Sequence, residues 1–166
     1  YKTVFFTLGI LQIILGLFML IPLIIQIIYK EVDSGFISAS IVCIIFGILF
    51  YLSNLDHEKK LNLPQAFLLT ALSWLTIAIF GSLPFIFSNI ELGLTDAFFE
   101  SMSGITTTGS TIISNLENTP KGILLWRAIL QWLGGIGIIV MAITLMPIMN
   151  IGGMQLLKIS SGDSSE

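Results

Sequence analysis

The sequence predicts an all-α integral membrane protein with four transmembrane helices, one short re-entrant helix and one extended segment at membrane depth. Hydrophobic residues make up 55% of the 166-residue chain and charged residues only 10%, which is far from the balance of a soluble domain. Four long apolar stretches are separated by polar loops, and each is long enough to cross a bilayer as a helix. The segment between the third and fourth stretches is too polar to cross and too apolar to be an ordinary loop.

The four predicted transmembrane helices cover residues 4–28, 36–52, 65–87 and 122–149. Pro64 suits the first turn of the third helix, where a missing amide costs nothing, whereas Pro22 and Pro147 are expected to kink or stop their helices. The fourth stretch would be about 42 Å long at 1.5 Å per residue, which exceeds the roughly 30 Å of the hydrocarbon core. We therefore expect this helix to tilt, break or protrude.

The loop after the second span is the most basic one, because it contains His57, Lys59 and Lys60. The positive-inside bias places this loop in the cytoplasm. The chain is then a multi-pass protein of the cytoplasmic (inner) membrane with a cytoplasmic amino terminus. Its net charge of −3 is small and scattered, so no nucleic-acid partner is expected. Cys43 is the single cysteine, which excludes a disulfide framework, and no cofactor is expected in the chain.

The segment DAFFESMSGITTTGSTII, between the third and fourth spans, predicts a short helix followed by extended backbone. Thr95 or Asp96 can cap the start of the helix, and Gly104 allows it to end. A β-branched run then favours extended backbone, and Gly109 can adopt a positive φ. Non-helical backbone persists at membrane depth only where protein surrounds it or where it lines a water-filled path.

A row of backbone carbonyls at that depth can replace the hydration shell of a small cation. The residues predicted to form this filter are Thr106, Thr107, Thr108, Gly109 and Ser110. The carboxyl end of the short helix would add a partial negative charge of about half an electron. No carboxylate lies between residues 101 and 116, which favours a monovalent over a divalent ion. The alternative is a polar extracytoplasmic loop with no ion role.

Glu100 and Arg127 are the two charged residues in strongly apolar surroundings. A charge at membrane depth costs at least about 2.5 to 3.5 kcal/mol, so such residues usually pair or face water. We expect them to pair behind the filter and support the short helix, outside the direct ion path. The alternative is that Arg127 reaches the outer interface and Glu100 reaches vestibule water. Trp74, Trp126 and Trp132 are interpreted as packing or lipid-facing aromatics, and Gly134, Gly135 and Gly137 as a packing patch.

These residues resemble the TrkH/KtrB family of potassium transporters, in the superfamily that also holds the plant HKT proteins. The resemblance covers residues 94–160, with DAFFESMSGITTTGST as pore helix and filter, LLWRAILQWLGGIGIIVMAITLMP as inner helix and GGMQLLKIS after it. In that family, four repeats of helix, pore loop and helix surround one ion path. Gly109 matches the filter glycine of one repeat, and the resemblance implies K⁺ as the transported ion.

The resemblance also implies a division of the chain into three parts. Residues 1–60 would form an amino-terminal two-helix hairpin, residues 61–152 the first repeat, and residues 153–166 a cytoplasmic tail or the start of a linker to a second repeat. Because one pore loop is present, we expect an amino-terminal piece of a longer transporter, with a tetramer of this chain as the alternative. The expected partners are the membrane, the remaining repeats and, in a homodimer, a cytosolic nucleotide-binding regulatory ring.

Potassium uptake is therefore the leading function, and two alternatives stay open. One is a conduit of the same architecture that discriminates poorly between K⁺ and Na⁺. The other is a non-conducting membrane bundle. An intramembrane hydrolase is not expected, because the possible nucleophiles Ser101 and Ser103 lie on the opposite side of the membrane from His57 in this topology. The chain is not expected to be an enzyme.

The predicted topology can be tested with single cysteines introduced into a protein from which Cys43 has been removed. An impermeant thiol reagent added from outside should label position 117 and leave position 58 unlabelled, because lysine bias and the number of spans agree. The reverse labelling pattern would contradict the predicted topology.

Overall fold

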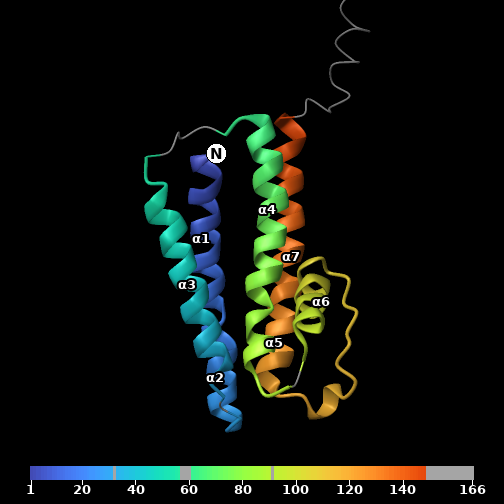
Figure 1. Ribbon diagram of the computed structural model, residues 1–166. Helices are drawn as coiled ribbons and strands as arrows, with labels where there is room; N and C mark the ends of the chain where they lie inside the picture. The colour runs from blue at the N-terminus through green and yellow to red at the C-terminus, as the bar shows by residue number, and fades with distance from the viewer. Residues whose placement is uncertain (32, 57–60, 91, 149–166) are drawn as a thin grey trace, which may run out of the picture. The chain divides into compact units, whose positions relative to one another are not determined.

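The computed structural model describes residues 1–31, 33–56, 61–90 and 92–148, and all regular structure among them is helical. The predicted all-α membrane fold is confirmed. In chain order the elements are α1 (Lys2–Phe18), α2 (Leu20–Tyr29), α3 (Gly35–Ser53), α4 (Leu63–Gly81), α5 (Leu83–Phe87), α6 (Leu94–Ile105), the 3-10 turn η1 (Leu116–Asn118) and α7 (Lys121–Ile148) (Figure 1).

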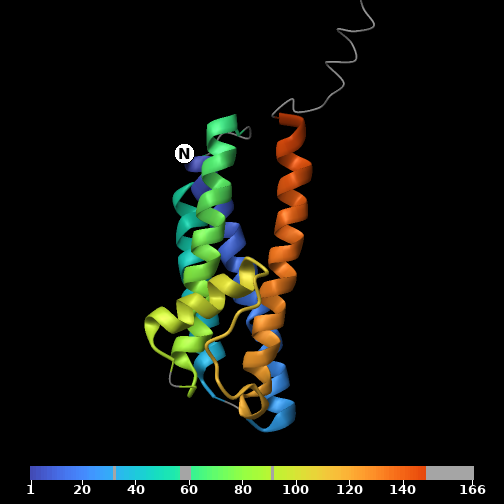
Figure 2. The same ribbon diagram turned by 90° about the vertical axis from the view of Figure 1, so that its right-hand side faces the viewer.

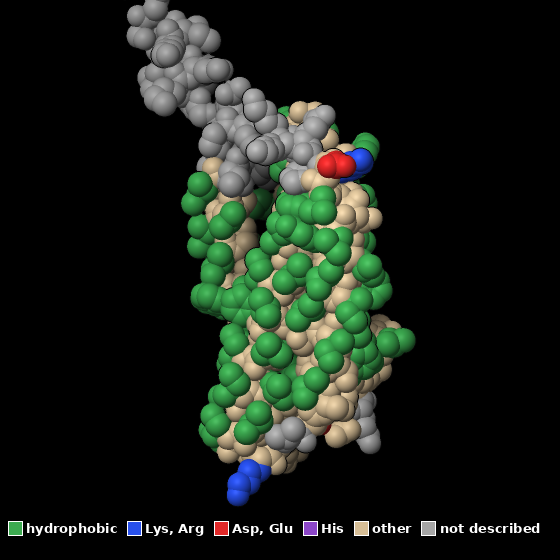
Figure 3. Space-filling view, turned by 90° about the vertical axis from the view of Figure 1, so that its left-hand side faces the viewer, with side chains coloured by type: hydrophobic (Ala, Val, Ile, Leu, Met, Phe, Trp, Pro, Cys, Tyr) green, Lys and Arg blue, Asp and Glu red, His purple; other side chains and the backbone are tan. Residues whose placement is uncertain are grey.

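Four helical stretches are long and apolar enough to cross a membrane, as the sequence predicts: Lys2–Tyr29, Gly35–Ser53, Leu63–Phe87 and Lys121–Ile143. On the face formed by the first two spans, apolar side chains cover the middle and coloured charges lie only toward the ends (Figure 3). Exposed isoleucine, leucine and phenylalanine side chains line α3 along this face. Such a band is what the hydrocarbon of a bilayer solvates.

Two of the spans are interrupted, and a proline explains each interruption. The first span breaks at Met19, between α1 and α2. The ring of Pro22 clashes with the carbonyl three to four residues earlier and removes one helical hydrogen bond. The third span breaks at Ser82, before Pro84, for the same reason. The Pro84 break was not predicted from the sequence. Helix α7, in contrast, is continuous over 28 residues, so the predicted excess length produces no break.

The start of α4 follows the sequence prediction. Pro64 lies in its first turn, and a reciprocal capping box joins Asn62 to Gln65. The side-chain oxygen of Gln65 accepts the amide hydrogen of Asn62 at 3.0 Å. These contacts satisfy amides that the first turn would otherwise leave unpaired.

The chain divides into two compact units, and the first, Tyr1–Gly135, holds everything that positions the short helix α6. The described part of the second unit continues α7 to Ile148. The predicted tail at 153–166 lies outside the described residues, and so do His57, Lys59 and Lys60 of the loop that is predicted to be cytoplasmic. The predicted division of the chain at residue 60 stays a prediction.

The core of the first unit joins the amino-terminal hairpin to the segments that surround α6. Its buried side chains come from α1 and the break after it, the first half of α3, α5, α6 and the first half of α7: Leu15, Met19, Phe36, Ala39, Cys43, Phe85, Ala97, Ile123, Trp126, Ile129 and Leu130. The hairpin also reaches α7 by a polar contact, since a carboxylate oxygen of Glu31 accepts the first amide of α7, at Lys121, at 2.8 Å. An acceptor of this kind completes a helix amino terminus.

Trp126 of α7 makes a hydrogen bond to the break in the third span. Its indole N–H donates to the carbonyl of Gly81 at 2.9 Å, and its ring packs edge-on against Phe36 with a centroid distance of 6.3 Å. The broken helix leaves the Gly81 carbonyl open, because the amide of Phe85 bonds to Ser82 instead. Sequence reasoning assigned Trp126 to packing and did not foresee this hydrogen bond.

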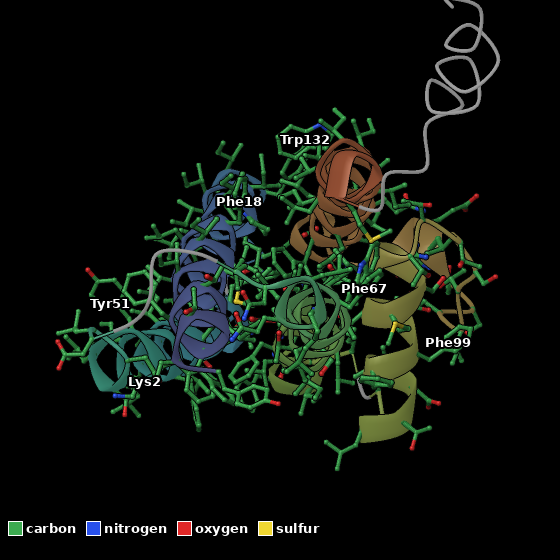
Figure 4. The ribbon with its side chains drawn as sticks, turned by 90° about the horizontal axis from the view of Figure 1, so that it is seen from above. Lys2, Phe18, Tyr51, Phe67, Phe99 and Trp132 are labelled. Carbon is green, nitrogen blue, oxygen red and sulfur yellow. The ribbon has the colours of Figure 1, made fainter. Side chains whose placement is uncertain are left out.

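We expect Trp126→Phe to lower the thermal stability of the detergent-solubilised protein, because it leaves the buried Gly81 carbonyl without a donor. The expected loss is about 1 kcal/mol or more of unfolding free energy. Trp132→Phe is the matched control, since Trp132 is 58% exposed and its indole makes a ring contact with Phe18 (Figure 4). Equal losses in the two variants would contradict the proposed importance of the hydrogen bond.

Candidate functional site

Helix α6 and the loop after it form an excursion that leaves and returns to the same end of the first unit. The chain enters at the end where α5 finishes, runs part-way up the bundle along α6, and descends through residues 106–115 to η1 and the start of α7 (Figures 1 and 2). Helix α6 lies beside α4, and Phe99 on its outer side points away from α4 (Figure 4). The short helix and the irregular segment after it are both present.

The carboxyl end of α6 differs in detail from the sequence prediction. The predicted stop at Gly104 is wrong, because the helix continues through Ile105. The chain leaves the helix at Thr107, which has the left-handed φ of 59°. The predicted extended conformation therefore fails at Thr106 and Thr107, since Thr106 also retains a near-helical backbone. Hydrogen bonds from the amides of these two threonines to the last turn of α6 hold this geometry.

Left-handed backbone is unusual for a β-branched residue such as Thr107, because its Cβ crowds the carbonyl oxygen. Strain of this kind costs roughly 1 to 3 kcal/mol and concentrates at functional sites. The hydroxyl groups of Thr106 and Thr108 approach each other to 2.9 Å across this residue. Gly109 has a φ of 77°, which agrees with the predicted positive φ.

The backbone carbonyls of Thr106, Thr107, Thr108 and Gly109 accept no hydrogen bond from the described part of the chain. All four residues are exposed. They follow directly on the carboxyl end of α6, where the helix dipole places a partial negative charge. This combination of free carbonyls and negative potential suits a cation better than an anion.

Ser103, in the last turn of α6, ties the loop back onto the helix. Its carbonyl accepts the amides of Thr108 at 3.0 Å and Gly109 at 3.3 Å, and its hydroxyl donates to the carbonyl of Ser110 at 2.7 Å. One side chain and one carbonyl thus fix three consecutive residues. The Ser110 carbonyl differs from the other four predicted filter carbonyls, because it points to Ser103. Sequence reasoning considered Ser103 only as an unlikely nucleophile and missed this role.

Glu100 is the second anchor of the loop. It is fully buried, and one carboxylate oxygen accepts both the hydroxyl of Thr111 at 2.6 Å and the amide of Ile112 at 2.5 Å. The other oxygen accepts the Nε–H of Arg127 at 2.7 Å. The structure thus brings Glu100 and Arg127 together and excludes the alternative in which they point to separate aqueous regions. The hydrogen bonds to Thr111 and Ile112 were not predicted.

Helix α7 packs closely against the carboxyl end of α6. A Cβ at Gly134 would lie 1.8 Å from the carbonyl oxygen of Ile105, whereas one at Gly135 would meet nothing within 4 Å. On the α6 side, Gly104 lies against Leu130, and a Cβ there would come within 3.0 Å. The interpretation of Gly134 as a packing glycine agrees with this close approach of the two helices.

Comparison with known proteins identifies this arrangement. The family described as TrkH, a cation transport protein, matches residues 32–164. The chain belongs to the TrkH family. It is 44% identical over 160 residues to the Trk system potassium uptake protein TrkI of Halomonas elongata, covering 96% of this chain and 32% of that protein. It is 40% identical over 152 residues to the Trk system potassium uptake protein TrkH of Escherichia coli K12, covering 90% and 32%.

A solved structure supports the same conclusion for the fold. The crystal structure of the potassium transporter TrkH from Vibrio parahaemolyticus matches with a TM-score of 0.85 and 36% identity, over 92% of this chain and 33% of that one. This TrkH-family chain therefore spans about a third of the length of the relatives that it matches.

If the buried pair matters as a unit in this TrkH-family chain, changes at Glu100 and Arg127 should not be additive. Arg127→Gln leaves a buried carboxylate without its cation, which typically costs about 3 kcal/mol. Adding Glu100→Gln should recover part of that loss, because the neutral amide oxygen can still accept hydrogen bonds from Thr111 and Ile112.

The measurement is a double-mutant cycle on the thermal stability of the purified full-length protein. Thr111→Val serves as the control, since it removes the hydrogen bonds of the Thr111 hydroxyl with Glu100 and with the amide of Ile113 but removes no charge. Losses at Glu100 and Arg127 that simply add would contradict an energetic coupling between the two residues.

Proposed function

We propose that this chain supplies one repeat of a potassium uptake pore in the cytoplasmic membrane. The observation that carries the proposal is the row of exposed carbonyls at Thr106, Thr107, Thr108 and Gly109, which accept no hydrogen bond from the described residues. Such carbonyls replace the water of a dehydrated monovalent cation. The names of the relatives, Trk system potassium uptake proteins, favour K⁺ as that cation.

Charge and position support the same assignment. The carbonyls lie where the negative end of the α6 dipole points, and no ionised side chain lies between Ser101 and Leu116. Glu100, the nearest carboxylate in the sequence, is neutralised by Arg127 and bonded on both oxygens. The local field therefore comes mainly from dipoles, which suits a monovalent ion that must also leave.

In this proposal, α6 is a re-entrant pore helix and residues 106–110 are a filter segment. Ser110 would contribute by fixing the end of the segment through Ser103, and Glu100 with Arg127 would support it from behind. The third span, α4 with α5, is the outer helix of the repeat, and α7 is the inner helix. The first two spans form a separate hairpin that packs on the repeat.

A single repeat cannot enclose a pore, so the proposal requires further repeats around the same axis. We propose that they belong to the same full-length polypeptide, since the relatives are about three times as long as the matched region. A homodimer with a cytosolic nucleotide-binding regulatory ring is the proposed assembly. The amino terminus is proposed to be cytoplasmic, which places residues 88–121 outside.

Two variants in the full-length transporter test the filter assignment. Gly109→Ser adds a Cβ at a φ of 77°, which side chains resist, and so turns or crowds the carbonyls. We expect the preference for K⁺ over Na⁺ to fall by about tenfold, as expected for strain of order 1 to 3 kcal/mol. Thr108→Ser keeps the backbone freedom and should change the preference less.

The measurement is paired K⁺ and Na⁺ flux in reconstituted vesicles, with the folded fraction checked by size-exclusion chromatography. A wild-type protein that carries both ions equally would favour the poorly discriminating conduit, and one that carries neither would favour the non-conducting bundle. Unchanged preference in folded Gly109→Ser protein would refute the assignment of Gly109 to the filter.

A further inference from the structure

Helix α7 presents one stripe of residues to α6 and the loop. Arg127, Gln131 and Gly134 are spaced by four and three residues, so they lie on the same face of the helix. Arg127 bonds to Glu100, and Gly134 packs against the carbonyl of Ile105. Gln131 lies between these two contacts, and neither the ion pair nor the close packing involves it.

The side chain of Gln131 reaches the filter glycine. A Cβ built on Gly109 would lie 3.0 Å from the Nε2 atom of Gln131, and no other atom outside the neighbouring residues comes within 4 Å of that position. Gln131 is exposed, and its side chain makes no hydrogen bond with the described part of the chain. A polar amide with free donors therefore lies directly beside a loop whose carbonyls are also free.

Gly109 is the point of the loop that most needs an external restraint. Glycine is the most permissive residue in backbone conformation, and the anchors at Ser103 and Glu100 act on its amide and on residues 110–112. Neither anchor acts on the carbonyl of Gly109 or on that of Thr108. The side-chain amide of Gln131 lies next to these two carbonyls, which neither anchor restrains.

We propose that Gln131 is a positioning residue for ion selectivity, whose side-chain amide braces the backbone at Gly109 and limits the directions that the adjacent carbonyls can take. The inference rests on the proposed function and adds a residue of the inner helix to the filter's support. The amide N–H groups supply the restraint, because a glutamine amide can donate two hydrogen bonds to carbonyl oxygens. Gln131 acts through the backbone and is not a ligand of the ion.

The test compares K⁺ and Na⁺ flux in the full-length transporter carrying Gln131→Leu or Gln131→Glu. Leucine keeps much of the volume and removes the amide, and glutamate keeps the shape but a carboxylate donates no hydrogen bond. Each change should lower the K⁺ to Na⁺ preference by about fivefold, the equivalent of one ordinary hydrogen bond. The maximal K⁺ flux should change less than the preference, because the other anchors still hold the loop.

Gln12→Leu is the matched control, because Gln12 is a buried glutamine of α1 that contacts Cys43. It should leave the preference unchanged. Folded Gln131 variants with the wild-type preference would overturn the inference while leaving the proposed function intact. Failure of both variants to fold would also overturn it, since bracing an exposed loop is not needed for folding. A wild-type protein without K⁺-selective flux would instead refute the proposed function itself.

Discussion

The arrangement around α6 depends on the compensation of one buried carboxylate. Glu100 is fully buried in a protein of very low charge content, and an isolated ion there would be strongly unfavourable. Three donors meet this requirement: Arg127 from α7, and the hydroxyl of Thr111 and the amide of Ile112 from the loop. Because these donors come from two segments outside α6, satisfying the carboxylate also sets where the loop and α7 lie relative to α6.

The loop can be irregular because its two ends are fixed. Ser103 holds residues 108–110 from the helix side, and Glu100 holds residues 111 and 112 from behind. Between the end of α6 and these anchors, Thr107 keeps a left-handed conformation that is costly for a threonine. The anchors therefore keep carbonyls exposed in a conformation that the sequence alone would not favour. This is the form of preorganisation that ion coordination by backbone requires.

The main features of the fold follow from the sequence because they depend on hydrophobicity over long windows. The four spans, the place of Pro64 in the first turn of α4 and the short helix with its following loop were all predicted, and composition and proline placement are local signals. The end of α6 was misplaced because tertiary contacts at Gly104 and Ile105 favour one more helical residue than the glycine alone suggests. The break before Pro84 carries a local signal, which the continuous hydrophobicity of the third span concealed.

The candidate site was partly accessible from the sequence. The pairing of Glu100 with Arg127 was predicted, because two opposite charges in an apolar chain have few other options. The roles of Ser103, Trp126 and Gln131 were not, since each depends on a carbonyl or a glycine brought close by folding. A serine in the last turn of a helix and a glutamine in the middle of one have many possible partners, and residue spacing alone does not identify the partner.

The most direct test of the proposed ion site is to locate bound ions in crystals of the full-length protein grown with Tl⁺ or Rb⁺ in place of K⁺. Both ions scatter anomalously and have the charge of K⁺. We expect anomalous peaks in contact with the backbone carbonyl oxygens of residues 106–109, with the carboxylate of Glu100 still bonded to Arg127 and the loop. Peaks that avoid these carbonyls, or that lie on the Glu100 carboxylate, would contradict it.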